Sequence, residues 1–124
     1  NCIASQRLIR TLCDCKLRYT PDEAELLESG LSPKMVKGYD FFNPKGCERC
    51  QGTGYRGRKA VVEIMEMNDE MREMFISRAA ITRIKQMALE SGTIFLRRAA
   101  LQEVFNGVTT LREANRVTFV EMDE

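Results

Sequence analysis

The chain has 124 residues, which leaves room for one ordinary domain or two very small ones. Hydrophobic residues make up 44% and charged residues 30%, a balance typical of a folded, soluble protein rather than a disordered one. Basic and acidic residues nearly cancel, 19 against 18, so the charge gives no support for binding to nucleic acid or anionic lipid. No apolar run is long enough for a membrane-spanning helix, and no signal-peptide pattern opens the sequence.

The absence of histidine excludes several kinds of site at once. A chain without imidazole has no histidine-based catalytic triad, no imidazole general base and no histidine metal ligand. In addition, no window matches the G-x-x-x-x-G-K-[ST] loop that cradles phosphates. We therefore expect no ATP hydrolysis by this chain alone.

The first half of the chain predicts short elements. Residues 1–12 begin without a helix cap or an initiator methionine, which suggests a piece of a longer polypeptide. Thr20-Pro21-Asp22-Glu23 is a capping box with proline at the first helical position, and it predicts a helix that ends at Gly30. A turn or short helix from Ser32 and a short strand over residues 39–42 follow.

The second half predicts a loop, a strand and then helices. Residues 46–58 are rich in glycine, cysteine and arginine and predict a loop, whereas the β-branched residues of 61–64 predict a strand. Apolar residues three and four apart predict helices that begin at Asn68 or Asp69, end near Gly92, span 94–105, and run from a capping box at 110–113 toward Val117. We interpret Met65, Met67, Met71, Met74 and Met87 as core filler.

Five cysteines form the most informative pattern. Their odd number, their close pairs and the lack of an export signal favour a metal site over disulfides. Cys47 and Cys50 belong to a C-x-x-C-x-G-x-G motif, whose tight turn lets both thiolates bind one tetrahedral ion. Cys13 and Cys15 offer a second pair, so a four-cysteine zinc site would order the long loop between the pairs.

The spacing of the first pair leaves alternatives open. C-x-C does not form the ordinary zinc knuckle, so Cys15 would ligate from a strained turn, or Asp14 or Cys2 would take its place. Free buried thiols and disulfides are the alternatives to zinc itself.

Three motifs in this order resemble the C-terminal part of the secretion ATPases, the hexameric motors of type II secretion and type IV pilus assembly. They are Gln6-Arg7-Leu8-Ile9-Arg10-x-Leu12-Cys13, the Cys47/Cys50 knuckle with Gly54-Tyr55-Arg56-Gly57-Arg58, and Gly107-Val108-Thr109-Thr110-Leu111-Arg112-Glu113 followed by Arg116-Val117-Thr118. The resemblance covers essentially the whole chain. This chain departs from the family's usual pattern at the C-x-C pair, at Ala60 in place of a glycine, and over residues 92–101.

The resemblance implies an α+β fold, with a small zinc-bound loop and strand subdomain followed by a mostly helical C-terminal subdomain. Residues 1–12 would be the end of a RecA-like ATPase core, 13–66 the tetracysteine zinc-binding subdomain, and 67–124 the helical subdomain. The implied zinc ligands are Cys13, Cys15, Cys47 and Cys50. Arg7 and Arg10 would lie near the nucleotide pocket or a subunit interface, or form a salt bridge within the core strand.

The resemblance also implies cofactors and partners. Zinc would be structural, and ATP and Mg²⁺ would bind only to the parent protein. The partners would be the upstream ATPase core, neighbouring subunits of a hexamer and an inner-membrane platform protein, with no nucleic acid and no direct membrane insertion. The protein would be cytoplasmic and peripheral at the bacterial inner membrane.

Two other classes share part of the cysteine pattern. DnaJ-type chaperone modules repeat C-x-x-C-x-G-x-G four times, whereas this chain has it once. A nucleic-acid-binding zinc ribbon would need a basic face, which the balanced charge does not favour. The motifs do not distinguish a pilus ATPase from a secretion ATPase.

Overall fold

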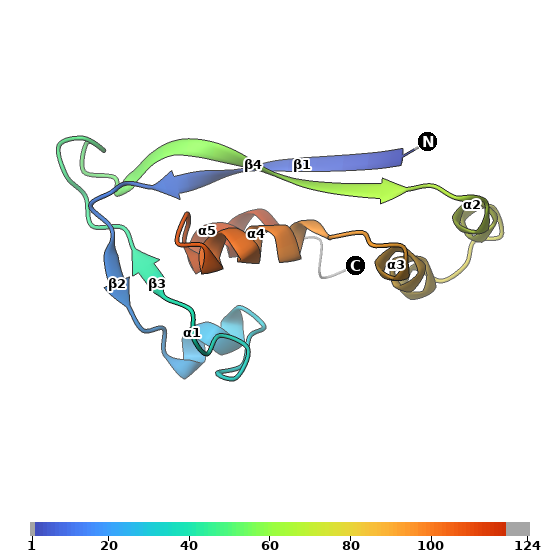
Figure 1. The fold of residues 1–124 in the computed structure, drawn as a ribbon, viewed down its shortest axis with the longest axis horizontal. Coiled ribbons are helices and arrows are strands. Elements are labelled where there is room, and N and C mark those ends of the chain that lie inside the picture. The colour runs from blue at the N-terminus through green and yellow to red at the C-terminus, as the bar shows by residue number, and fades with distance from the viewer. Residues whose placement is uncertain (1, 119–124) are drawn as a thin grey trace.

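The computed structural model describes the backbone of residues 2–118 and the side chains of residues 4–118 (Figure 1). The fold is α+β, as predicted. In chain order the elements are β1 (Cys2–Leu12), β2 (Leu17–Tyr19), α1 (Glu23–Glu28), β3 (Phe41–Asn43), β4 (Tyr55–Glu66), α2 (Asp69–Ile76), α3 (Ile81–Glu90), α4 (Leu96–Phe105) and α5 (Leu111–Thr118). No helix among residues 2–118 combines the length and the apolar character needed to cross a membrane.

Two long antiparallel strands form the upper layer in Figure 1, with α4 and α5 beneath them. β1 pairs with β4 from Cys2 opposite Glu66 to Arg10 opposite Arg58, and the register shifts before Leu12 meets Tyr55. Successive side chains of a strand point to opposite faces, so Ile9 and Val61 are buried against the helices.

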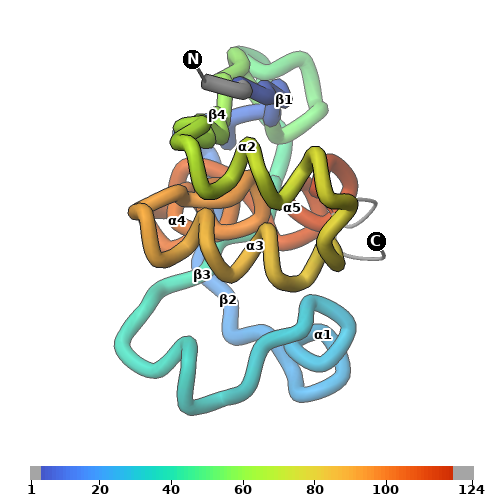
Figure 2. Tube along the Cα trace, turned by 90° about the vertical axis from the view of Figure 1, so that its right-hand side faces the viewer, coloured from blue at the N-terminus to red at the C-terminus, as the bar shows by residue number. Residues whose placement is uncertain are grey.

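A second, smaller layer lies at the opposite side of the helices. β2 pairs with β3, Leu17 opposite Asn43, and α1 connects them (Figure 2). Leu26, Leu31 and Phe41 of this layer bury their side chains in the same core as Ile9 of β1. The helices α4 and α5 therefore share one hydrophobic core with the long sheet above and the small sheet below.

The helices α2 and α3 form a second, methionine-rich core. Met71, Ile84 and Ala88 are buried there, and Met65, Met67, Met74 and Met87 pack against them. The interpretation of these methionines as core filler is confirmed. The flexible, unbranched thioether fills the irregular space between two short helices and the end of β4.

The turn between α4 and α5 docks on the edge of β1. The backbone N–H of Leu12 donates to the carbonyl of Val108 at 2.7 Å, and the Thr109 hydroxyl donates to the carbonyl of Arg10 at 2.7 Å. The Arg10 N–H donates to the carboxylate of Glu113 at 2.8 Å. The turn thus satisfies backbone groups that a strand edge would leave unpaired.

The start of α1 differs from the sequence prediction. Asp22, rather than Thr20, is the N-cap, because its side chain accepts a hydrogen bond from the Glu25 N–H at 2.7 Å. The Thr20 box would have started the helix two residues earlier. The two other predicted caps are confirmed: Asn68 accepts from the Met71 N–H, and Thr110 accepts from the Glu113 N–H.

Two strand predictions were also inaccurate. β4 begins at Tyr55 and reaches Glu66, so the predicted loop is too long and the predicted strand too short. The partner strand β1 extends β4 into glycine- and arginine-rich sequence with little intrinsic preference for a strand. The short strand β3 lies at Phe41–Asn43 rather than 39–42, and α4 begins at Leu96 rather than residue 94.

Candidate metal centre

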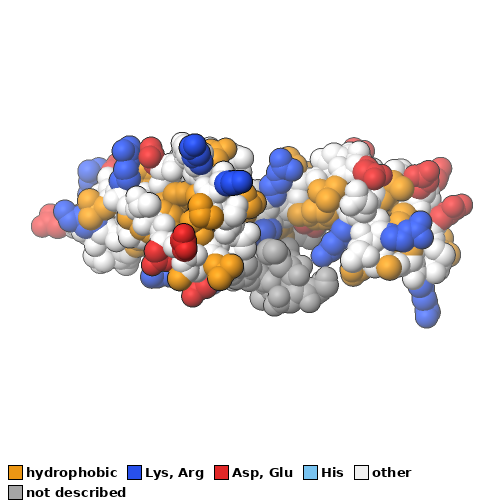
Figure 3. Space-filling view, turned by 90° about the horizontal axis from the view of Figure 1, so that it is seen from below, with side chains coloured by type: hydrophobic (Ala, Val, Ile, Leu, Met, Phe, Trp, Pro, Cys, Tyr) orange, Lys and Arg blue, Asp and Glu red, His pale blue; other side chains and the backbone are white. Residues whose placement is uncertain are grey.

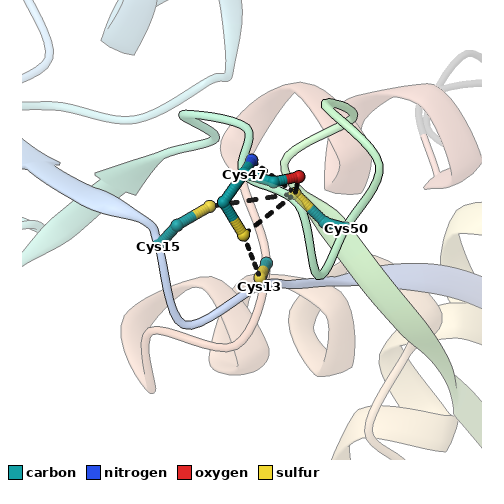
Figure 4. A group of neighbouring side chains, drawn as sticks. All are labelled: Cys13, Cys15, Cys47 and Cys50. Atoms are coloured by element: carbon teal, nitrogen blue, oxygen red, sulfur yellow. Dashed lines mark hydrogen bonds between the residues drawn. The ribbon is translucent and has the colours of Figure 1, made fainter.

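Four cysteine side chains converge where the long sheet meets the small one. The sulfur atoms of Cys13, Cys15, Cys47 and Cys50 all lie within 4.8 Å of one another, and the side chains point toward a common centre (Figure 4). Cys13 and Cys15 come from the connection between β1 and β2, whereas Cys47 and Cys50 come from the loop between β3 and β4. The structure describes all four as free cysteines.

The sulfur separations match a tetrahedral zinc site. Cys13 Sγ lies 3.6 Å from Cys47 Sγ, Cys47 Sγ lies 3.7 Å from Cys50 Sγ, and Cys15 Sγ lies 3.9 Å from Cys50 Sγ. Zinc–thiolate bonds of about 2.3 Å in a tetrahedron place sulfurs about 3.8 Å apart. The donor set therefore fits an ion of that size and softness.

The C-x-C spacing reaches the site through a turn. The Lys16 N–H donates to the Cys13 carbonyl at 3.0 Å, so residues 13–16 reverse the chain direction. The prediction that C-x-C is unfavourable assumed an extended chain, in which these side chains could not converge. A turn removes that difficulty and brings Cys15 alongside Cys50.

Neither alternative ligand lies at the centre. Asp14 is exposed and pairs with Arg49 at 3.7 Å, pointing away from the sulfurs. Cys2 has its side chain outside the described residues, but its backbone is at the far end of β1 from Leu12, about 34 Å away at about 3.4 Å per residue. Cys13, Cys15, Cys47 and Cys50 are thus the cysteines that the fold brings together.

Hydrogen bonds from the backbone stabilise the thiolate of Cys50. The N–H groups of Cys47 and Gly54 donate to its sulfur at 3.1 and 3.2 Å. Burial opposes ionisation, yet these donors dominate and lower the pKa of Cys50 to about 6. Cys15 receives less support, and burial raises its pKa to about 11. The thiolate is the form that binds a metal ion.

Gly54 is required by the shape of the loop. Its φ of +84° lies in the left-handed region, and a Cβ there would lie 2.2 Å from the Cβ of Pro44. Its carbonyl also accepts a hydrogen bond from the Cys13 N–H at 3.0 Å. The glycine after the C-x-x-C motif therefore joins the two halves of the site directly.

Arg10 forms the salt bridge foreseen among its alternatives. Its NH2 group lies 3.2 Å from Glu113 Oε1, and its guanidinium lies over the ring of Tyr55 at 4.1 Å. Arg116 binds the other carboxylate oxygen of Glu113 at 2.6 Å. The Glu113 side chain is 1% exposed, and despite burial these arginine contacts lower its pKa to about 2.

Arg7 lies one pair of strand residues away, and its guanidinium donates to the Gln6 carbonyl at 3.0 Å. The structure brings Arg10 into the network of Glu113 but does not bring Arg7 there. A contact of either arginine with nucleotide or with a neighbouring subunit stays a prediction.

Sequence reasoning missed Arg97. This partly buried arginine of α4 donates to Asn115 Oδ1 of α5 at 2.7 Å and to the Ser29 carbonyl at 2.6 Å. Burial lowers its pKa. It links α1 to α5 across the core, and no local pattern distinguishes it from the exposed arginine beside it.

An α+β domain with four cysteine thiols at tetrahedral separations is the class that the fold and site define. The family model described as "Type II/IV secretion system protein" matches residues 1–116. The chain therefore belongs to the type II/IV secretion system protein family. This membership argues against the DnaJ-type and zinc-ribbon hypotheses.

Curated relatives come from both branches of this family. The chain is 39% identical to the type IV pilus assembly ATPase PilB of Thermus thermophilus over 90% of this chain and 13% of that protein. It is 36% identical to PilB of Myxococcus xanthus over 91% of this chain and 20% of that protein. It is 34% identical to the type II secretion system protein E of Aeromonas hydrophila over 94% of this chain and 23% of that protein. The chain spans less than a quarter of the length of these relatives.

Proposed function

We propose that the chain is a zinc-stabilised module of an ATPase that powers type IV pilus assembly or type II secretion. The observation that carries the proposal is the convergence of four cysteine sulfurs at separations of 3.6 to 3.9 Å, in a member of this family. Cys13, Cys15, Cys47 and Cys50 are the zinc ligands, and the role of the ion is structural.

The ion would hold the small layer against the long sheet. The two ligand pairs enclose β2, α1 and β3, which contain two strands of three residues and one helix of six. Such short elements do not fold on their own, so metal-binding free energy supplies local folding free energy. The zinc site thereby fixes the position of α1 relative to β1 and β4.

The parent protein would bind ATP and Mg²⁺ in an upstream core and assemble as a hexamer. In that arrangement residues 1–12 end the core, 13–66 form the zinc subdomain and 67–124 form the helical subdomain. Arg7 and Arg10 would lie near the nucleotide or a subunit interface. The module would transmit movement to an inner-membrane platform protein from the cytoplasmic side.

Replacement of Cys47 by serine in the parent protein tests the proposal. We expect about one zinc per chain in the unaltered protein and loss of that zinc in the Cys47→Ser variant, measured by elemental analysis. Hydrogen exchange should increase across residues 13–58, whereas the second core around Met71 should stay protected. Cys2→Ser is the matched control, because residue 2 lies far from the site.

The metal claim and the motor claim fail separately. Full protection of residues 13–58 in a metal-free protein would contradict the structural zinc. A parent protein that holds zinc but supports neither pilus assembly nor secretion in its own cell would contradict the motor assignment.

A further inference from the structure

A groove of about 770 Å³ lies between the lower face of the β1–β4 sheet, α3 and the start of α4. Its apolar lining includes Met65, Phe75, Ile81, Ile84, Phe95 and Leu101. Phe75 and Ile81 remain 43% and 51% exposed, an unusual state for large apolar side chains gathered in one depression. The described residues therefore leave an apolar surface here that a further segment would cover.

The rim of this groove is basic. Arg7, Lys85, Arg97 and Arg98 line it, and Glu63 is the one acidic residue of the lining within the described part of the chain. The Glu63 carboxylate already accepts a hydrogen bond from the Leu96 N–H at 3.0 Å. Lys and Arg side chains lie beside apolar ones near the middle of the face in Figure 3. The groove thus favours an occupant that is both apolar and acidic.

The sequence supplies such a segment directly after α5. Residues 119–124 read Phe-Val-Glu-Met-Asp-Glu, three apolar and three acidic residues with no basic one. Thr118, the last residue of α5, is fully buried, and its hydroxyl accepts a hydrogen bond from the groove residue Arg97 at 3.2 Å. An extended chain of six residues reaches about 20 Å, so the segment starts at the groove and is long enough to follow it.

We propose that segment 119–124 of the same chain binds in this groove. Phe119 and Met122 pack on the apolar lining, and the carboxylates of Glu121, Asp123 and Glu124 face the basic rim. The tether through Thr118 gives the segment an effective concentration in the millimolar range, which favours it over a separate partner. Binding would hold α3 against α4 and so join the second core to the first.

A single fluorophore tests the proposal, since the chain contains no tryptophan. In the F119W variant we expect emission shifted to the blue and weak quenching by acrylamide, compared with a free peptide of the same sequence. Reversing one rim charge with Lys85→Glu or Arg98→Glu should lower the ratio of bound to free segment about fivefold. Lys34→Glu, on an exposed turn away from the groove, is the matched control and should leave the emission unchanged.

Three outcomes would overturn the proposal. Quenching equal to that of the free peptide would mean that the segment is not bound. Emission that ignores Lys85→Glu and Arg98→Glu as fully as Lys34→Glu would remove the charge argument. Emission that depends on protein concentration would assign the groove to the segment of a second copy.

A second measurement avoids dependence on the altered residue. A chain that stops at Thr118 should show shifted amide resonances for Lys85 and Arg98, and a synthetic 119–124 peptide at millimolar concentration should restore them. The same peptide with its acids changed to amides should bind more weakly. Failure of the peptide to move these resonances would contradict the proposal even if F119W perturbs the fold.

Discussion

Replacement of Glu113 by glutamine should destabilise the protein in a way that depends on pH. The Glu113 carboxylate is 1% exposed, accepts the Arg10 N–H at the edge of β1 and binds the guanidinium groups of Arg10 and Arg116. A neutral amide of the same size keeps one acceptor oxygen but loses the charge that holds both arginines. The variant therefore removes charge with little change in packing.

The magnitude follows from the pKa of Glu113. Folding lowers this pKa from the ordinary 4.5 to about 2. Each unit of lowering corresponds to about 1.4 kcal/mol, so the charged form contributes up to about 3 kcal/mol to the free energy of unfolding. Because the folded pKa lies below the unfolded one, this contribution is complete above about pH 4.5 and disappears as the pH falls toward 2.

Urea unfolding of the two proteins at a series of pH values measures the effect. We expect Glu113→Gln to be less stable by about 2 to 3 kcal/mol at pH 7, and the difference to shrink below pH 4.5. Loss of metal in acid affects both proteins alike and cancels in the difference. Glu73→Gln, an exposed position on α2, serves as the control and should change stability by less than about 0.5 kcal/mol.

Two results would refute this reasoning. A difference that stays constant from pH 7 to pH 3 would show that the lost interaction is not ionic. A midpoint near the ordinary value for the Glu113 carboxyl, read from its carbon chemical shift, would show that the arginine contacts do not persist in solution.

Further substitutions test other contacts. Cys15→Ser should lower zinc content measured by elemental analysis, since its sulfur lies 3.9 Å from that of Cys50; full retention of zinc would mean that three cysteines suffice. Gly54→Ala should destabilise the protein by at least about 1 to 2 kcal/mol in thermal unfolding, because φ is +84° and the new Cβ would overlap Pro44; an unchanged melting temperature would contradict this. Arg97→Ala should cost about 1 to 3 kcal/mol and expose the Ser29 region to hydrogen exchange, because it leaves a buried carbonyl without this donor; exchange that is unchanged there would show that water replaces the guanidinium.

Local signals in the sequence predicted the helices well. Asn68 and Thr110 were identified as caps because a side chain that bonds to a backbone N–H three residues later acts within one turn. The choice between Thr20 and Asp22 failed for the same reason, since both residues can act as an N-cap and local sequence does not rank them. Elements defined by contacts within a few residues are accessible to such reasoning.

Long-range pairing was harder to predict. β4 extends through Arg56, Gly57 and Arg58 because β1 lies beside it, and nothing within residues 55–60 indicates that partner. The cysteine cluster was predicted from residue type and motif, but its C-x-C half seemed unfavourable because the turn at 13–16 depends on a hydrogen bond from Lys16. The docking of residues 107–113 on β1 was missed because it joins segments almost a hundred residues apart.

The position of the cysteines at one end of the long hairpin bears on how the chain folds. Pairing of Leu12 with Tyr55 closes a loop over residues 13–54, and closing a loop of about 40 residues costs about 3 kcal/mol in chain entropy before any strand contact forms. An ion that joins residues 13–15 to 47–50 closes nearly all of that loop beforehand. Strand pairing can then proceed from the Leu12 end toward Cys2, one residue pair after another, as in a local hairpin. The metal centre thereby lowers the effective contact order of the β1–β4 sheet, so refolding should be faster with zinc present than without it.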